Sequence, residues 1–154
     1  MRRLQYSEFE RQIYINSFLV RLGTMNKIKL GIEERCKLVN DILDGAGNIF
    51  GYIDPILIDT KSNLSADTIK EICLICGVDS AYFEDMRIFI DIIVLKRRNA
   101  IAHGRQEYIT EGEIDSFVAK ALALMEHFRT LLENKVYMKM YLASGATRSV
   151  VTEC

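Results

Sequence analysis

The sequence predicts an all-α protein that folds as an up-down bundle of four or five helices with mostly antiparallel neighbours. Three observations carry this prediction. Apolar residues recur at three- and four-residue spacing through most of the 154 residues. Ser-x-x-Glu and Thr-x-x-Glu patterns, which form capping boxes at helix starts, precede two of these stretches. Strand alternation and hairpin signals are not evident, and proline occurs once.

The first helix is expected behind Ser7 and Glu10, which have capping-box spacing, and Gly23 is its expected stop. Residues 44–47, Asp-Gly-Ala-Gly, should weaken or break a second helix, and residues 48–53 either continue it or are irregular. A boundary is expected at Asp54, because a residue before proline disfavours the helical conformation. The apolar positions that predict the second helix are Ile32, Cys36, Val39 and Leu43.

A third helix is expected to begin at Ser65 as its N-cap and to end at Gly77. Ser80, with Asp79 beside it, offers the next cap. From there an apolar pattern runs without a break to His103, and Gly104 is suited to end the helix. This stretch includes residues 89–95, FIDIIVL, the most apolar run of the chain. A helix that is apolar on nearly all sides needs burial on more than one side.

The last helix is expected to open at Thr110 and Glu113, a second capping box, and to extend as far as Leu142. Residues 144–147 resemble the start of a frayed tail. The apolar side of this amphipathic helix is expected to hold Ile114, Phe117, Val118, Ala121, Leu122, Met125, Phe128, Leu131 and Leu132.

Length and composition indicate one domain over residues 1–154 with a real core. The formal net charge of −1 excludes a global basic field, so any nucleic acid must be bound by a local patch. No apolar run approaches the roughly 18 to 20 residues that span a bilayer, and no signal segment follows Met1. We therefore expect a cytoplasmic protein that does not enter a membrane.

Two cysteines, Cys73 and Cys76, have the C-x-x-C spacing of redox and zinc sites. Their surroundings are apolar and helical, and no second Cys/His pair lies at zinc-ligand spacing. Buried free thiols are the expected state.

The basic stretch Lys96–Gly104 ends the apolar run and holds one of the two histidines, His103. Asn99 and His103 are four residues apart and share a helix face. Arg98 lies five residues before His103, about 140° around the axis and about 7.5 Å along it. One straight helix would not aim both side chains at the same phosphate. Either the last turn loosens near Gly104, or a second subunit brings its own copy of the stretch.

These residue types suit the cleavage of an RNA phosphodiester. Histidine can take the proton of a ribose 2′-hydroxyl near neutral pH, and arginine can stabilise the charge that grows on the phosphoryl oxygens. Lys96, Arg97 and Arg105 add positive charge that attracts a phosphate backbone. Spacing alone is weak evidence, because basic residues and histidine at a helix C-terminus also gain from the helix dipole.

The fuller stretch Leu95–Gly104, LKRRNAIAHG, resembles the R-N-x-x-x-H signature of the HEPN superfamily. The order of elements from about residue 63 to residue 135 is similar to that of prokaryotic stand-alone HEPN domains. A short helix is followed by the turn at residues 77–79, then by a long helix that ends in the signature, then by a loop and a long amphipathic helix.

The resemblance implies a helical homodimer whose motifs face each other across a cleft. It also implies a metal-independent endoribonuclease without a cofactor, which leaves 2′,3′-cyclic phosphate ends and serves as a toxin or in antiviral defence. The catalytic positions would be Arg98 and His103, with Asn99 beside the arginine. An antitoxin or a nucleotidyltransferase is a possible partner. Some members carry a tyrosine two residues after the histidine that a partner nucleotidyltransferase modifies; here Arg105 stands there, which speaks against that regulation.

Supporting roles are open for two further residues. Asp91, inside the apolar run, needs a partner if buried, and it would orient Arg98 or a residue across the dimer, or be an ordinary capping or solvated acid. Tyr108 would stack on a base, or be an exposed loop residue.

Two other functions fit the same sequence. One is a non-catalytic module that binds RNA or a nucleotide or docks a nucleotidyltransferase. The other is a purely structural helical dimer.

Overall fold

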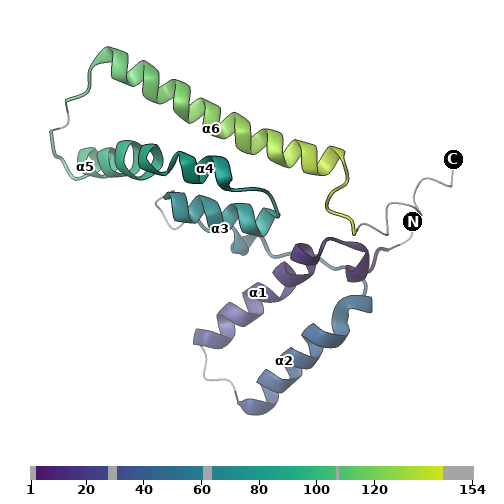
Figure 1. The fold of residues 1–154 in the computed structure, drawn as a ribbon. Helices are drawn as coiled ribbons and strands as arrows, with labels where there is room; N and C mark the ends of the chain where they lie inside the picture. The colour runs from purple at the N-terminus through teal and green to yellow at the C-terminus, as the bar shows by residue number, and fades with distance from the viewer. Residues whose placement is uncertain (1–2, 28–30, 61–63, 107, 144–154) are drawn as a thin grey trace. The chain divides into compact units, whose positions relative to one another are not determined.

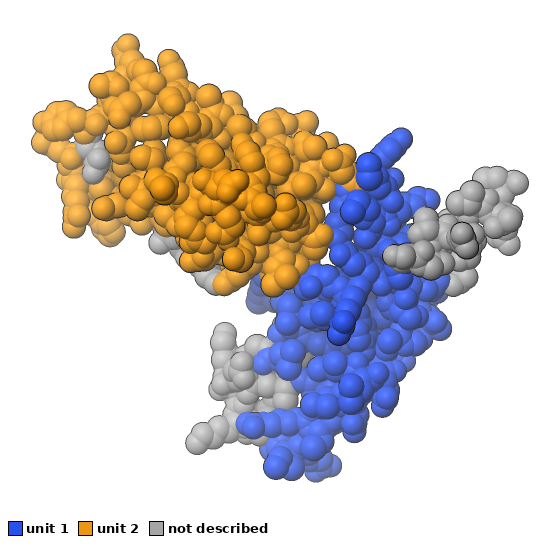
Figure 2. All heavy atoms as spheres, viewed as in Figure 1, with its two compact units in different colours: residues 1–58, 135–154 blue, residues 59–134 orange. Residues whose placement is uncertain are grey.

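The computed structural model describes residues 3–27, 31–60, 64–106 and 108–143. The described residues form six α-helices and no β-strand, so the predicted all-α class is confirmed. They divide into two compact units (Figures 1 and 2). The first unit comprises residues 1–58 and 135–154, and the second comprises residues 59–134. The prediction of a single domain over the whole chain stays a prediction.

The first unit contains α1 (Arg11–Lys27) and α2 (Ile32–Asp44), with three short 3-10 turns η1 (Tyr6–Glu8), η2 (Gly45–Gly47) and η3 (Pro55–Leu57). Backbone pairs join its ends: the amide of Tyr6 donates to the carbonyl of Asn48 at 3.0 Å, and the amide of Ala143 donates to the carbonyl of Glu8 at 2.9 Å. Ring contacts between Tyr6, Phe9, Tyr14, Phe18 and Phe50 fill the space between these segments.

Two predictions for the first unit are wrong. The acid of the first capping box is Glu8 and not Glu10. The carboxylate of Glu8 accepts from the amide of Gln5 at 2.9 Å at the start of η1. Gly23 does not end α1, which continues to Lys27. The α2 helix is present as predicted, but its apolar positions Ile32, Cys36, Val39 and Leu43 are exposed, and the buried residue is Leu38.

The second unit contains α3 (Ala66–Cys76), a long helical segment and α6 (Glu111–Tyr137), which continues into the first unit after Asn134. The long segment comprises α4 (Ala81–Asp85), the π-helix η4 (Phe89–Lys96) and α5 (Arg97–Ala102). Successive helices alternate in direction (Figure 1). Their shared core is formed by Ala66, Cys73, Phe83, Phe89 and Ile90.

The helix ends of the second unit follow the predicted capping residues. The Ser65 hydroxyl accepts from the amide of Thr68 at 3.1 Å, and Gly77 ends α3 with a φ of 63°. The carboxylate of Glu113 accepts from the amide of Thr110 at 3.0 Å. The predicted continuation of α6 to Leu142 is wrong, since the helix ends at Tyr137.

The two C-x-x-C cysteines are free thiols, with Cys73 fully buried and Cys76 half-buried. Burial raises the pKa of the Cys73 thiol to about 11. A thiol in this state stays protonated and is a poor nucleophile. This placement indicates that Cys73 and Cys76 are packing residues and not a redox pair.

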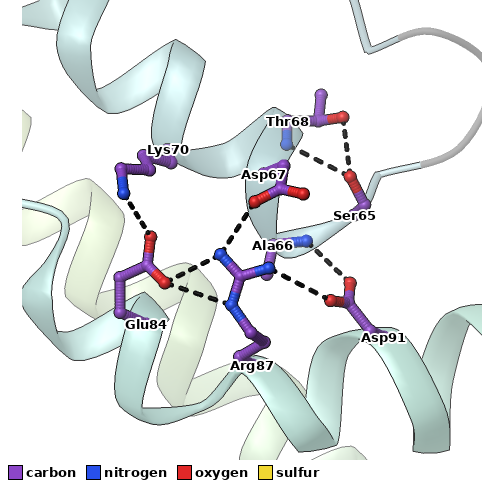
Figure 3. A network of polar contacts seen from close by, with 8 residues as sticks. All are labelled: Ser65, Ala66, Asp67, Thr68, Lys70, Glu84, Arg87 and Asp91. Atoms are coloured by element: carbon purple, nitrogen blue, oxygen red, sulfur yellow. Dashed lines mark hydrogen bonds and ion pairs between the residues drawn. The ribbon is translucent and has the colours of Figure 1, made fainter.

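A polar network joins α3 to α4 and η4 (Figure 3). Arg87 donates to Glu84 and to Asp67, each at 2.8 Å, and lies 3.7 Å from Asp91. Lys70 of α3 lies 3.1 Å from the other oxygen of Glu84. Asp91 accepts from the amide of Ala66, the first residue of α3, at 2.8 Å. The N-terminus of α3 is therefore capped by its own Ser65 and by an acid 25 residues later.

The network should make stability depend on pH. Hydrogen bonds from Arg87 and Lys70 lower the pKa of Glu84 below its ordinary value of 4.5. A depressed carboxyl pKa contributes stability above about pH 4.5 that is lost as pH falls through the folded pKa. We expect urea unfolding to show a smaller loss of stability between neutral pH and about pH 3 in Glu84→Gln than in the wild type. Glu126→Gln, an exposed glutamate on α6, is the control; an equal change in both variants would contradict this assignment.

Candidate functional site

The basic stretch ends the long helical segment at a defined cap. The amide of His103 donates to the carbonyl of Asn99 at 3.0 Å, which continues the helical pattern of α5. Gly104 then takes a left-handed φ of 72°, and the amide of Arg105 returns to the carbonyl of Ala100 at 2.9 Å. This turn is the Gly C-cap that the sequence predicts. It folds the backbone so that Arg105 lies beside the last turn of α5.

A groove of about 360 Å³ runs along this last turn. It brings together five of the predicted site residues: Asn99 and His103 from the motif, Lys96 and Arg105 from the basic cluster, and Asp91 from η4. Arg97, Arg98 and Tyr108 are not among the described residues that line it. Leu95 and Ala100 complete the lining, and sequence reasoning missed both because they carry no polar group.

Arg98 lies beside the groove. It is exposed, and its Nη1 donates to the Oδ1 of Asn99 at 2.9 Å. His103 is also exposed. The guanidinium therefore contacts the groove through Asn99, which lines it. On an α-helix, Arg98 and His103 start about 140° apart around the axis.

Arg97 points toward α6. Its guanidinium carbon lies 5.1 Å from the ring centroid of Phe117, and its Nη2 lies 3.7 Å from the carboxylate of Glu113. No hydrogen-bond acceptor among the described residues reaches the buried Nη1 of Arg97. The Arg97 side chain therefore supports helix packing more directly than it presents charge to a ligand.

Replacing Arg97 or Arg98, the two neighbouring arginines, should change the melting temperature by different amounts. A cation over an aromatic ring contributes about 1 kcal/mol, so we expect Arg97→Ala to lower the melting temperature by a few degrees. Arg98→Ala, whose side chain is exposed, should leave the melting temperature within about one degree of the wild type. Calorimetry on both variants measures the difference, and an unchanged melting temperature in Arg97→Ala would contradict the packing role.

The two supporting residues differ in their placement. Asp91 is half-buried and contacts the amide of Ala66 and the guanidinium of Arg87. The suggested contact with Arg98 is not among its described contacts, and Arg87 takes that place. Arg87 could have been found from the sequence, since it stands four residues before Asp91 on a helix. Tyr108 is 88% exposed in the loop after the motif, so stacking on a bound base stays a prediction.

The groove has a mixed electrostatic character. Lys96 and Arg105 supply positive charge, His103 supplies an imidazole, and Asp91 is the one acid among its described lining residues. Among the described residues, no group of three or more His, Cys, Asp or Glu side chains is placed to hold a metal ion. The arrangement can bind an anion and place a titratable imidazole against it.

Comparison with known proteins identifies the family. The family model described as RiboL-PSP-HEPN matches residues 1–134, which is most of the chain. The match includes the residues before Pro55, beyond the range in which the sequence motifs resemble the superfamily, and it ends where the second unit ends. No curated protein and no solved structure matches the chain. Within the described residues, no helix is both long and apolar enough to cross a membrane. On the family match, with the R-N-x-x-x-H stretch at the end of α5, the chain belongs to the RiboL-PSP-HEPN family of HEPN domains.

Proposed function

We propose that the protein is a metal-independent endoribonuclease of HEPN type, and that it acts as a homodimer in toxin or antiviral-defence systems. One observation carries the proposal. In a chain of a HEPN family, Asn99 and His103 line one groove together with two basic side chains, and Arg98 stands at its edge. RNA is the substrate that these groups suit, because it carries both the phosphate and the 2′-hydroxyl that they would engage.

The chemistry assigns one role to each residue. The imidazole of His103 takes the proton of the ribose 2′-hydroxyl. The 2′-oxygen then attacks the adjacent phosphorus, and the bond from phosphorus to the 5′-oxygen of the next nucleotide breaks. Arg98 stabilises the negative charge that grows on the phosphoryl oxygens, and Asn99 orients Arg98. Lys96 and Arg105 hold neighbouring phosphates. The leaving 5′-oxygen takes a proton from water, and the imidazolium of His103 returns its proton to solvent, so the products are a 2′,3′-cyclic phosphate and a 5′-hydroxyl.

The dimer part of the proposal rests on two features. Arg98 and His103 start about 140° apart around the helix axis, and His103 lines the groove while Arg98 does not, so a second copy of the motif would complete the site. Apolar side chains on the same helical segment are exposed beside the motif, including Ile88 at 74%, Ile92 at 50% and Ile101 at 55%. Exposed apolar side chains of this kind often form the contact with a partner protein. A partner antitoxin would restrain the activity by covering the same groove.

The test is RNA cleavage in the presence of EDTA, with the chemical ends of the products determined. We expect cleavage to persist in EDTA and the products to carry 2′,3′-cyclic phosphate and 5′-hydroxyl ends. Tight binding of RNA without turnover would instead favour a non-catalytic binding module. Products with 3′-hydroxyl ends would reject the mechanism, because a 2′-oxygen nucleophile cannot give them.

A further inference from the structure

The π-helix η4 lies directly before the motif and changes which residues share its face. In a continuous α-helix, at about 100° per residue, Asn99 would lie about 80° from Asp91 around the axis and His103 about 120° from it. A π-helix bonds each residue to one five positions along and turns about 82° per residue. With that turn from Asp91 to Lys96, Asn99 and His103 both lie within about 30° of Asp91. This alignment accounts for the three residues lining one groove.

Asp91 is held in place from outside the motif. One of its oxygens accepts from the amide of Ala66 at 2.8 Å, and the other lies 3.7 Å from the guanidinium of Arg87 (Figure 3). Arg87 is itself fixed by Asp67 and Glu84, each at 2.8 Å. The negative charge in the groove is therefore tied to the start of α3 and does not depend on the rotamers of the motif.

From these two observations we propose that Asp91 is a positioning residue of the groove, that Arg87 holds it there, and that the π-helix brings it onto the face of Asn99 and His103. A fixed carboxylate repels phosphate from its own end of the groove. The scissile phosphate is thereby confined to the end that carries His103 and Arg105. This inference rests on the proposed ribonuclease function and adds the network that sets where the RNA backbone binds.

Asp91→Asn separates positioning from structural support. The amide oxygen of asparagine can still accept from the amide of Ala66, while the charge is lost. We expect the KM for RNA to stay equal or fall, because repulsion is removed, and kcat to fall about tenfold, because RNA binds in unproductive positions. A purely structural role would lower the melting temperature and would not lower kcat while KM stays equal or falls. Asp85→Asn, an exposed aspartate on α4, is the matched control.

Arg87 should act through Asp91. We expect Arg87→Met to lower kcat in the wild-type background and to have no further effect on kcat in Asp91→Asn. Its effect on the melting temperature should remain in both backgrounds, because Arg87 also bonds Asp67 and Glu84. Additive losses of kcat in the double variant would reject the coupling.

A one-residue deletion tests the π-helix. Removing the half-exposed Ile92 should let η4 relax to an α-helix and keep Asp91 within about 20° of Asn99 and His103, because seven and eleven steps of about 100° are close to whole turns. If the deletion variant keeps its helical circular dichroism, kcat should stay within about threefold of the wild type. The same deletion in a regular α-helix would turn Asp91 by about 100°, so a loss of about tenfold or more would contradict the role assigned to the π-helix. If it does not fold, the Asp91→Asn measurements decide.

A readout independent of turnover completes the test. The chain has only two histidines, so the imidazole resonances of His103 and His127 can be assigned in long-range ¹H–¹⁵N spectra. We expect the His103 signals to move in Asp91→Asn while those of His127, stacked on Tyr82 at 4.2 Å, stay in place. Unmoved His103 signals with an unchanged kcat and KM would overturn the inference. Moved signals in a protein that does not cleave RNA would reject the ribonuclease proposal and leave the positioning role standing.

Discussion

Replacing His103 with alanine should lower the rate of RNA cleavage by at least about a hundredfold, since a positioned general base contributes about a hundred- to ten-thousandfold. The exposed side chain makes little contribution to packing, so the fold should be retained. The measurement is cleavage of a labelled RNA in EDTA, with circular dichroism to follow the fold.

The chain offers its own control for this variant. His127 is the other histidine, and it packs between α6 and α4 against Tyr82 and Phe83, away from the groove. His127→Ala should affect stability and leave the catalytic rate of the folded protein close to that of the wild type. Wild-type cleavage by His103→Ala would end the ribonuclease proposal.

Mixing two inactive variants should restore activity if the site is composite. Arg98→Ala and His103→Ala are each expected to be inactive as homodimers. When their subunits exchange, half of the dimers carry one copy of each, and one of the two sites in these dimers has both an intact Arg98 and an intact His103. The mixture should therefore recover about a quarter of the wild-type activity.

The recovery depends on which protomer supplies each residue. If Arg98 and His103 of the same protomer act together, every site in the mixture lacks one of them and activity stays absent. Refolding the two variants together and separately provides the comparison, and size-exclusion chromatography with light scattering checks that dimers form. A monomeric wild type that cleaves RNA at full rate would contradict the composite site.

Local signals account for the parts of the fold that the sequence predicts. Ser65, Gly77, Thr110 and Glu113 act within one turn of their own positions, and each caps a helix end as expected. The same kind of signal gave a wrong prediction of a capping box at Glu10. Glu8 already closes the turn before α1, and Glu10 instead pairs with Lys135. Competition between nearby acids is decided by partners distant in the chain, which a local pattern does not contain.

The candidate site likewise combines features that local helix geometry predicts with contacts between residues distant in the sequence. The shared face of Asn99 and His103 follows from helix geometry and is present in the groove. The position of Asp91 does not follow from a regular α-helical pattern, because the chain forms a π-helix from Phe89 to Lys96. Its contact with Ala66 joins residues 25 apart, and the inward turn of Arg97 depends on Phe117 of α6. Patterns within one helix do not encode such contacts.

The discontinuity of the first unit has a consequence for synthesis on the ribosome. The segment around η1 pairs with residues that follow α6, as in the bond from the amide of Glu10 to the carbonyl of Tyr141 at 2.8 Å. The second unit is contiguous in the sequence, from Asp59 to Asn134. Because chains emerge from the N-terminus, the helices that carry the groove can pack before the first unit receives its last segment. The earliest folded species on the nascent chain should thus be the part that holds the motif.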